Sequence, residues 1–356
     1  MSYLLLDSDY TVLSEIDEYD SMIWTDRHRE YGDFELYGRP DLFLSSGVAA
    51  WRYLMSRDSD RAMIIEDLSI STDIDQGPKM TVTGRSLESI LCRRVIWPPA
   101  TVDGSLDDCV FKLVNDHFIN PKDPNRRVDN MVYVRSSDPY ITETHATIQF
   151  AGEYVYDAIH AICDVYNLGF KMALIGGQLV FTLYKGFDRS FNQDILPWVV
   201  FSPDFDNIAG TSYSRKTSDS ASFAYVAGKD ISGEERVTTD VDLGRTGLSR
   251  VELFVDASDL RPENDDGTEM SDEDYKAVLE ERGLETLCAA TPTEYFEGSM
   301  VTTGVYVYNR DFFLGDIVQI QNEFSISATS QILEVVHTKD QTGETLIPTF
   351  SSPEFN

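Results

Sequence analysis

The segment from Met63 to Pro99 limits the possible folds more than any other part of the chain. Its first half separates apolar from polar side chains by parity: Ile64, Leu68, Ile70, Thr72 and Ile74 share one parity, and Asp67, Ser69, Ser71 and Asp73 share the other. This period of two predicts a half-buried β-strand, with Glu66 the one exception on the apolar side.

The second half of the segment predicts a turn, a second strand and a short helix. The alternation is interrupted at Asp75–Pro78 and resumes at Met80, Val82 and Gly84. Ser86 then begins a helix with an apolar face and a cationic end, formed by Leu87, Ile90 and Leu91 and by Arg93 and Arg94. The segment has the form of a barrel-building module, and nothing in it is catalytic.

Charge excludes several classes of partner. The 356 residues, enough for two or three domains, include 61 acidic and 29 basic side chains and carry a net charge of −32. This charge argues against binding to nucleic acid or to an anionic membrane surface. Two interpretations stay open: a solvated acidic surface that keeps the protein soluble, or an acidic wall facing a molecule such as DNA that must pass without sticking.

Targeting signals are not expected. The run from Met1 to Asp7 lacks the positive region and the apolar length of a signal peptide, and no segment approaches the roughly 20 apolar residues of a membrane helix. The four cysteines, Cys92, Cys109, Cys163 and Cys288, are widely spaced, which favours reduced thiols in apolar cores. We therefore expect no membrane insertion, and synthesis and assembly in a cytoplasm.

The order of patterns predicts an α+β, mainly β fold with three domains. Residues 1–100 predict strands separated by Gly, Pro and Asp turns, typical of a barrel or sandwich. Residues 101–195 predict an α+β domain with helices after Ser105 and from about Tyr154 to Leu168, Gly169 as its C′ residue, and a hairpin around Gly176-Gly177. Residues 196–356 predict a second β domain with a helical insertion at about 261–290, capped by Ser271 and Asp274.

No residue is predicted to be catalytic, cofactor-binding or metal-binding. The five histidines, at positions 28, 117, 145, 160 and 337, lack paired ligand spacing, and no nucleophile elbow or phosphate loop is present. A calcium loop around Asn264–Gly267 fails because Pro262 would occupy its first ligand position, although this acidic loop leaves weak cation binding open. Three aromatic groups, Tyr295-Phe296, Tyr306–Tyr308 and Phe312-Phe313, suit core packing better than a sugar platform.

Several stretches resemble one family in the same order along the chain. The Met63–Pro99 segment, with its Gly84-Arg85-Ser86-Leu87 and Trp97-Pro98, resembles the N-terminal part of the tail hub proteins of long-tailed bacteriophages, often described simply as phage tail protein. The stretches Tyr31–Leu36, Val155–Tyr184, Leu314–Val318 and Ser327–Thr329, followed by Ile332–Val335, are similar to further motifs of that family. Residues 257–300 match it least.

This resemblance implies a structural role without enzymatic activity or cofactor. Family members resemble the baseplate hub of contractile-tailed phages, in which two tube-like β domains per chain let a homotrimer present six barrels. Such a hub joins the sixfold tail tube to the threefold tip and forms part of the DNA channel. The implied partners are the distal tail protein, the tape measure protein and the tip or receptor-binding proteins, and the implied location is the virion.

A ring of three such chains implies further properties of its subunit contacts and of its lumen. Head-to-tail contacts must close the ring. Three chains carry 3 × −32 = −96, so apolar contacts must overcome a repulsion that salt screens beyond about 8 Å. An acidic lumen would let DNA slide through without specific binding.

Two other functions stay open. One is a tail-associated cell-wall-degrading enzyme, a lysin or endopeptidase, although the chain ends at Asn356 directly after the last hub-like strand and leaves no room for such a module. The other is a carbohydrate-binding tail adhesin, which only the aromatic groups favour.

Overall fold

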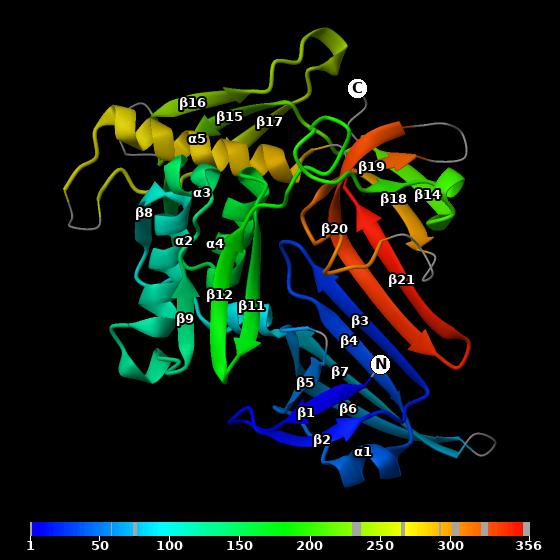
Figure 1. Ribbon diagram of the computed structural model, residues 1–356. Helices are drawn as coiled ribbons and strands as arrows, with labels where there is room; N and C mark the ends of the chain where they lie inside the picture. Colours follow the sequence, from blue (N-terminus) through cyan, green and yellow to red (C-terminus); the bar gives the residue numbers. More distant parts are fainter. Residues whose placement is uncertain are drawn as a thin grey trace.

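One large open sheet runs through most of the molecule (Figure 1). The computed structural model describes residues 2–57, 59–73, 77–229, 236–264, 268–291, 293–300, 306–321 and 327–351. The strands of the sheet follow the order β14-β18-β21-β20-β3-β4-β7-β6-β5-β1-β2, with β19 beside β20 and β13 beside β19. Strands from both ends of the chain therefore belong to one sheet.

The N-terminal strands form the lower half of the sheet in Figure 1. They are β1 (Tyr3–Leu6), β2 (Val12–Ile16), β3 (Ser21–Arg27), β4 (Asp33–Gly38), β5 (Tyr53–Ser56), β6 (Ala62–Asp73) and β7 (Gly77–Ser86). The short helix α1 (Pro40–Ser46) buries Phe43 in a core with Phe34, Leu36 and Met80. The first two strands, β1 and β2, pair antiparallel as a hairpin.

The β6–β7 hairpin confirms the predicted strand, turn and strand, but its parity differs from the prediction. A β-bulge between Ile65 and Asp67 puts Ile64 on the opposite face from Leu68. Leu68 and Ile70 share a face with the buried Val82 and are nevertheless 39% and 55% exposed. The reason is that β5 pairs with β6 only as far as Ile64, so no described strand lies beside the outer half of β6.

The helix predicted after Ser86 is the 3₁₀-helix η1 (Leu87–Arg93) rather than an α-helix. Ser86 occupies its N-cap position without a capping bond from its side chain. Its hydroxyl instead accepts a hydrogen bond from the backbone N–H of Gly32, at 2.8 Å. This interaction ties η1 to the loop between β3 and β4.

The middle of the chain packs helices against a small mixed sheet. Its elements are β8 (Ala100–Ser105), α2 (Leu106–Val114), η2 (Asn115–Ile119), η3 (Pro124–Arg126), β9 (Met131–Val134), α3 (Pro139–Glu143), β10 (His145–Phe150), α4 (Val155–Val165), β11 (Gly169–Ile175) and β12 (Gln178–Tyr184). The predicted helix after Ser105 and the Gly176-Gly177 hairpin are confirmed. Gly169 is not a C′ residue, because Asn167 adopts the left-handed conformation after α4 and Gly169 begins β11.

The last part of the chain completes the large sheet and adds a small unit beside it. The sheet receives β13 (Val200–Phe201), β14 (Ile208–Lys216), β18 (Thr293–Met300), β19 (Ile317–Gln321), β20 (Ser327–Asp340) and β21 (Gly343–Phe350), and η4 (Pro203–Phe205) precedes β14. The small unit consists of β15 (Phe223–Ala227), β16 (Thr238–Asp242), η5 (Gly247–Ser249), β17 (Glu252–Asp256) and α5 (Asp272–Ala289).

The predicted helical insertion corresponds to α5, and its predicted cap is confirmed. The Ser271 hydroxyl accepts a hydrogen bond from the Asp274 backbone N–H, at 3.1 Å. Gly283 stands where α5 meets the small sheet, and a Cβ there would lie 2.7 Å from Val241 and 2.8 Å from Val226.

The two halves of the large sheet repeat the same strand arrangement. The N-terminal half has the order β3-β4-β7-β6-β5, and the C-terminal half has the order β14-β18-β21-β20-β19. The β6–β7 and β20–β21 hairpins even carry a bulge at the same place, between Ile65 and Asp67 and between Ile332 and Glu334. Ile65 and Ile332, Asp67 and Glu334, and the last hairpin residues Asp73 and Asp340 are each 267 positions apart.

The mainly β, α+β fold class is confirmed. Within the described ranges no sheet closes into a barrel, so the expected barrels take the form of open, repeated layers. The boundaries 1–100, 101–195 and 196–356 stay a prediction. Over the part of the chain that the structure describes, no helix has the length and apolarity needed to cross a membrane.

Candidate functional site: the buried polar junction

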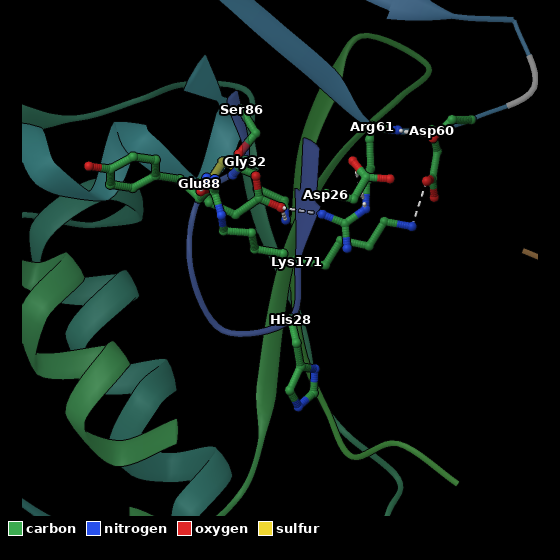
Figure 2. Close-up of polar contacts among 12 residues, drawn as sticks. Asp26, His28, Gly32, Asp60, Arg61, Ser86, Glu88 and Lys171 are labelled. Atoms are coloured by element: carbon green, nitrogen blue, oxygen red, sulfur yellow. Dashed lines mark hydrogen bonds and ion pairs between the residues drawn. The ribbon is translucent and has the colours of Figure 1, made fainter. Parts of the chain in front are cut away.

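The N-terminal strands and the middle region meet at the buried side chain of Arg61 (Figure 2), and Tyr308 from the C-terminal part lies beside it. The Arg61 guanidinium lies between two carboxylates, with Nη1 at 3.3 Å from Glu88 Oε1 and Nε at 3.9 Å from Asp26 Oδ1. Arg61 precedes β6, Asp26 lies on β3 and Glu88 lies on η1. We call these three residues the Arg61 clamp.

Both carboxylates of the clamp also accept hydrogen bonds from outside the trio. Trp24 Nε1 and the Tyr308 hydroxyl donate to Asp26 at 3.0 and 3.2 Å, and the backbone N–H of Met172 donates to Glu88 at 3.0 Å. Tyr308 belongs to the C-terminal part and Met172 to β11. The clamp therefore joins all three parts of the chain through buried charges that are paired and hydrogen-bonded.

A second buried group surrounds His28, below the clamp in Figure 2. His28 Nδ1 lies 3.1 Å from the Tyr184 hydroxyl, and the His28 backbone N–H donates to the Leu333 carbonyl at 2.8 Å. Gly169 and Gly315 pack so closely that a Cβ at either position would lie 2.4 or 2.3 Å from the imidazole ring. The ring thus fills the space between β11 and the turn before β19.

Burial controls the ionisation of both groups. Burial itself lowers the pKa of Arg61, but Asp26 and Glu88 outweigh it and raise that pKa above its usual range. Burial, with the nearby cations Arg29 and Arg61, holds the pKa of His28 well below 6.5. Burial and Asp26 raise the pKa of Tyr308 well above 10. His28 is therefore neutral, and Tyr308 keeps the proton that it donates.

Two motifs that carried the family resemblance lie at this junction. Gly32 and Ser86 exchange hydrogen bonds of 2.8 Å in both directions, which links the Tyr31–Leu36 stretch to Gly84-Arg85-Ser86-Leu87 (Figure 2). The buried Asp316 carboxylate accepts from the backbone N–H of Phe187 at 2.9 Å and from Arg189 Nε at 2.7 Å. Within the residues placed by the structure, both motifs therefore hold segments together.

The structure separates the five histidines. His28 and His117 are buried, His145 is exposed, His160 lies between Glu30 and Asp164, and His337 faces Glu344. Across the described ranges, no three His, Cys, Asp or Glu side chains gather in a group that could hold a metal ion. Asp265, Asp266 and Gly267 of the acidic loop lie outside the described residues.

All four cysteines are free, as predicted, but Cys92 and Cys288 are only half-buried. Cys109 and Cys163 are buried, and burial raises the pKa of Cys109 to about 12. Such thiols are poor nucleophiles because the reactive thiolate is disfavoured.

The aromatic groups mostly pack in the interior. Phe312 is fully buried against Phe201, with ring centroids 5.4 Å apart. Tyr306 and Tyr308 pack against the same core, while Phe313 is 39% exposed, and the side chains of Tyr295 and Phe296 lie outside the description. Among the described residues these rings form no exposed, continuous platform for a sugar.

Among the described residues, two cavities flank Tyr308. One of about 660 Å³ is lined by Tyr3, Trp24, Asp26, Tyr306 and Tyr308, and the other of about 560 Å³ by Arg61, Lys171, Tyr184, Lys185 and Tyr308, among others. The charged groups that face them are occupied: Lys171 Nζ lies 2.5 Å from Asp60, and Lys185 lies over the Tyr140 ring. Among the described residues, the charged side chains of the junction are paired with one another, which suits a role in holding the three parts of the chain together.

Known proteins share this whole architecture. The solved structure of the 43 kDa tail protein of prophage MuSo2 from Shewanella oneidensis matches with a TM-score of 0.60 at 10% identity, covering 99% of this chain and 98% of that chain. The tail protein from Neisseria meningitidis MC58 matches with a TM-score of 0.59 at 14% identity, covering 98% and 96%. Prophage tail protein gp18 from Listeria monocytogenes EGD-e matches with a TM-score of 0.58 at 13% identity, covering 100% and 96%.

At these identities the three structures establish the fold, which is that of phage tail proteins. No curated protein sequence matches the chain. A family model, described as Siphovirus ReqiPepy6 Gp37-like protein, matches residues 3–350. The chain therefore belongs to the Siphovirus ReqiPepy6 Gp37-like family of siphovirus tail proteins.

Proposed function

We propose that this tail protein is a trimeric, non-enzymatic hub at the tail tip, which joins the sixfold tail tube to the threefold tip and forms part of the DNA channel. The observation that carries the proposal is the repeat of one strand arrangement in both halves of the large sheet. A chain with two equivalent layers presents six layers when three copies form a ring, which matches a sixfold tube on one side and a threefold tip on the other.

One face of the sheet suits the wall of such a channel. On the N-terminal strands, the face opposite the core carries Glu35, Ser69, Ser71, Thr81 and Thr83. These side chains are acidic or hydroxyl-bearing. The cations of β7 on the same face, Lys79 and Arg85, are both paired, with Lys79 Nζ at 2.5 Å from Asp20 and Arg85 Nε at 2.7 Å from Glu66. A polyanion such as DNA would therefore meet paired cations on this face of β7, which favours passage without specific binding.

The remaining partners are other tail proteins: the distal tail protein, the tape measure protein, and the tip or receptor-binding proteins. The proposed location is the virion, after assembly in the host cytoplasm. The three regions 1–100, 101–195 and 196–356 are proposed as two tube-like β domains around an α+β domain.

The stoichiometry tests this function. We expect native mass spectrometry of the chain, co-expressed with its neighbouring tail proteins, to give a species containing three copies, or three times 40.2 kDa, about 121 kDa, from this chain. A chain that stays monomeric, or that forms twofold dimers beside those partners, would contradict the proposal. Clearing of host cell wall in a zymogram would contradict its non-enzymatic part.

A further inference from the structure

Several edges of the large sheet have no neighbour among the described strands, and two of them, on β6 and on β14, are related by the internal repeat. β6 lies inside the strand order but pairs with β5 only through Ala62–Ile64, so its edge from Asp67 to Thr72 faces no described strand. β14 is the terminal strand, and it pairs with β18 on one side and with no described strand on the other. Open edges of this kind present backbone N–H and C=O groups that can pair with another chain.

The internal repeat indicates which kind of strand can pair with the β6 edge. Asp67–Thr72 of β6 is equivalent to Glu334–Lys339 of β20, because the bulges and hairpin ends of the two strands coincide. Glu334–Lys339 is the segment that pairs antiparallel with β3, from Arg27 to Met22. The β6 edge is therefore a second copy of an edge that is already filled within the chain.

The same comparison shows that β14 is the equivalent of β3 in the C-terminal half of the sheet. Trp24 of β3 stands opposite Phe34 of β4, and Tyr213 of β14 stands opposite Phe296 of β18. β4 and β18 take equivalent places in the two halves of the sheet, because Phe34 of β4 is opposite Gly84 of β7 and Phe296 of β18 is opposite Phe350 of β21. Arg27 follows Trp24 by three residues, and Lys216 follows Tyr213 by three residues, so Arg27 and Lys216 occupy equivalent positions.

We propose that β6 of one copy pairs antiparallel with β14 of the next copy, in the register that β20 and β3 use within the chain. Asp67 then stands opposite Lys216 of the neighbouring copy, and Ser69 stands opposite Ser214 of that copy. This inference rests on the proposed ring of identical chains and specifies its interface. The contact is head-to-tail, because two different edges meet, and repetition of such a contact can close a ring.

Charge supports this register. At the internal junction, Arg27 Nε and Glu334 Oε2 form an ion pair of 2.6 Å. The equivalent positions, Lys216 and Asp67, again bring a cation opposite a carboxylate, and Ser212, Ser214 and Lys216 are exposed on one side of β14. A shift by two residues would put Lys216 opposite Ser69, which cannot form the ion pair.

Burial supports the same interface. Leu68 is 39% exposed, whereas its equivalent at the filled junction, Val335, is 2% exposed. Leu68 and Ile70 stand on the core side of a strand whose outer half has no described neighbour. A strand docked on this edge would cover apolar surface as well as satisfy backbone hydrogen bonds.

Cysteine pairs test the register directly in the full chain. We expect a mixture of the single variants Ser69→Cys and Ser214→Cys to form a disulfide-linked dimer under mild oxidation, because facing residues on antiparallel strands have Cα atoms about 4.5–5.5 Å apart. Each variant alone, and the wild type with its four native thiols, should give no such product. The pair Ser71→Cys with Ser214→Cys, two residues out of register, is the matched control and should not cross-link.

Charge reversal gives an independent readout. Asp67→Lys should weaken ring formation at least several-fold, and the double variant Asp67→Lys with Lys216→Asp should restore it, while Asp129→Lys, an equal charge change at an exposed site, should have no effect. A threefold ring that forms without the Ser69–Ser214 cross-link and tolerates Asp67→Lys would overturn this interface and leave the proposed function standing. Absence of any ring in the presence of the tail partners would overturn both.

Discussion

At the scale of single residues, the Arg61 clamp stabilises the junction between the three parts of the chain. Arg61 is 6% exposed, Asp26 5% and Glu88 1%, so removal of the guanidinium would leave two carboxylates in the interior without their cation. Such an uncompensated buried charge is far more costly than the loss of an exposed ion pair.

We therefore expect Arg61→Met to lower the free energy of unfolding by about 3–5 kcal/mol, measured by urea denaturation. Arg85→Met is the matched control, since Arg85 pairs with Glu66 at a partly exposed site and its loss should cost about 1 kcal/mol or less. Equal losses of unfolding free energy in the two variants would show that the Arg61 clamp stabilises the protein no more than the partly exposed ion pair does.

His28 makes stability depend on pH. Its folded-state pKa lies well below 6.5 because of burial and the cations Arg29 and Arg61, so the unfolded chain binds a proton that the folded chain does not. Stability therefore falls as the pH decreases below about 6.5, with a contribution of at most about 1.4 kcal/mol per pH unit. His117, whose pKa is lowered by burial, acts in the same direction, whereas the raised pKa of His160 acts in the opposite one.

We expect His28→Gln to flatten the dependence of the unfolding free energy on pH between 7 and 5, relative to wild type. His160→Gln provides the control of opposite sign: because the pKa of His160 is raised in the folded chain, its removal should steepen the fall of stability at low pH. An unaltered slope in the His28 variant would mean that the buried imidazole is not the group that titrates.

At the scale of elements, the bulged hairpin is the unit that the fold uses twice. Gly84 is needed where β7 crosses the bulge of β6, because a Cβ there would lie 1.8 Å from the Ile64 carbonyl oxygen. The close approach is to backbone, which cannot move aside without breaking the pairing.

Gly84→Ala should accordingly destabilise the protein by about 1–3 kcal/mol or more, seen as a lower denaturation midpoint. Thr81→Ala on the same strand, where the side chain is only partly buried, should change stability by less than about 0.5 kcal/mol. Retention of the wild-type midpoint by Gly84→Ala would contradict the tight crossing.

The sequence predicts correctly those elements that depend on residues close to one another in the chain. The Gly176-Gly177 hairpin and the Ser105 and Ser271 caps each depend on residues close in sequence, and all three are present. β14 was missed because its apolar and polar residues do not alternate and because its partner β18 follows only after the small unit of β15–β17 and α5. The clamp was missed because Tyr308, Asp26 and Arg61 are brought together by tertiary packing, although the charged Asp26-Arg27 at the end of a strand was an available signal.

At the scale of the whole molecule, the repeat connects the fold to assembly. The internal β20–β3 contact joins two equivalent layers, and the free β6 and β14 edges offer the same contact to a neighbour. The polar sheet face with Glu35, Ser69, Ser71, Thr81 and Thr83 would then line a common channel.

A cation placed on that face should slow the passage of DNA. We expect Glu35→Lys to reduce the rate of DNA ejection from assembled particles while ring formation stays normal, because three new cations per ring would face the phosphate backbone. Asp129→Lys adds the same charge outside the sheet and should leave ejection unaffected. Normal ejection in the Glu35 variant would place this face away from the DNA.

The arrangement of the assembled ring tests the central claim most directly. Cryo-electron microscopy of the chain assembled with its tail partners should show three copies, six equivalent β layers in one ring, β6 beside β14 of the next copy, and the acidic and hydroxyl-bearing face turned toward the channel. A threefold ring whose channel is lined by another face, or an assembly in which the β6 and β14 edges both face solvent, would contradict this account.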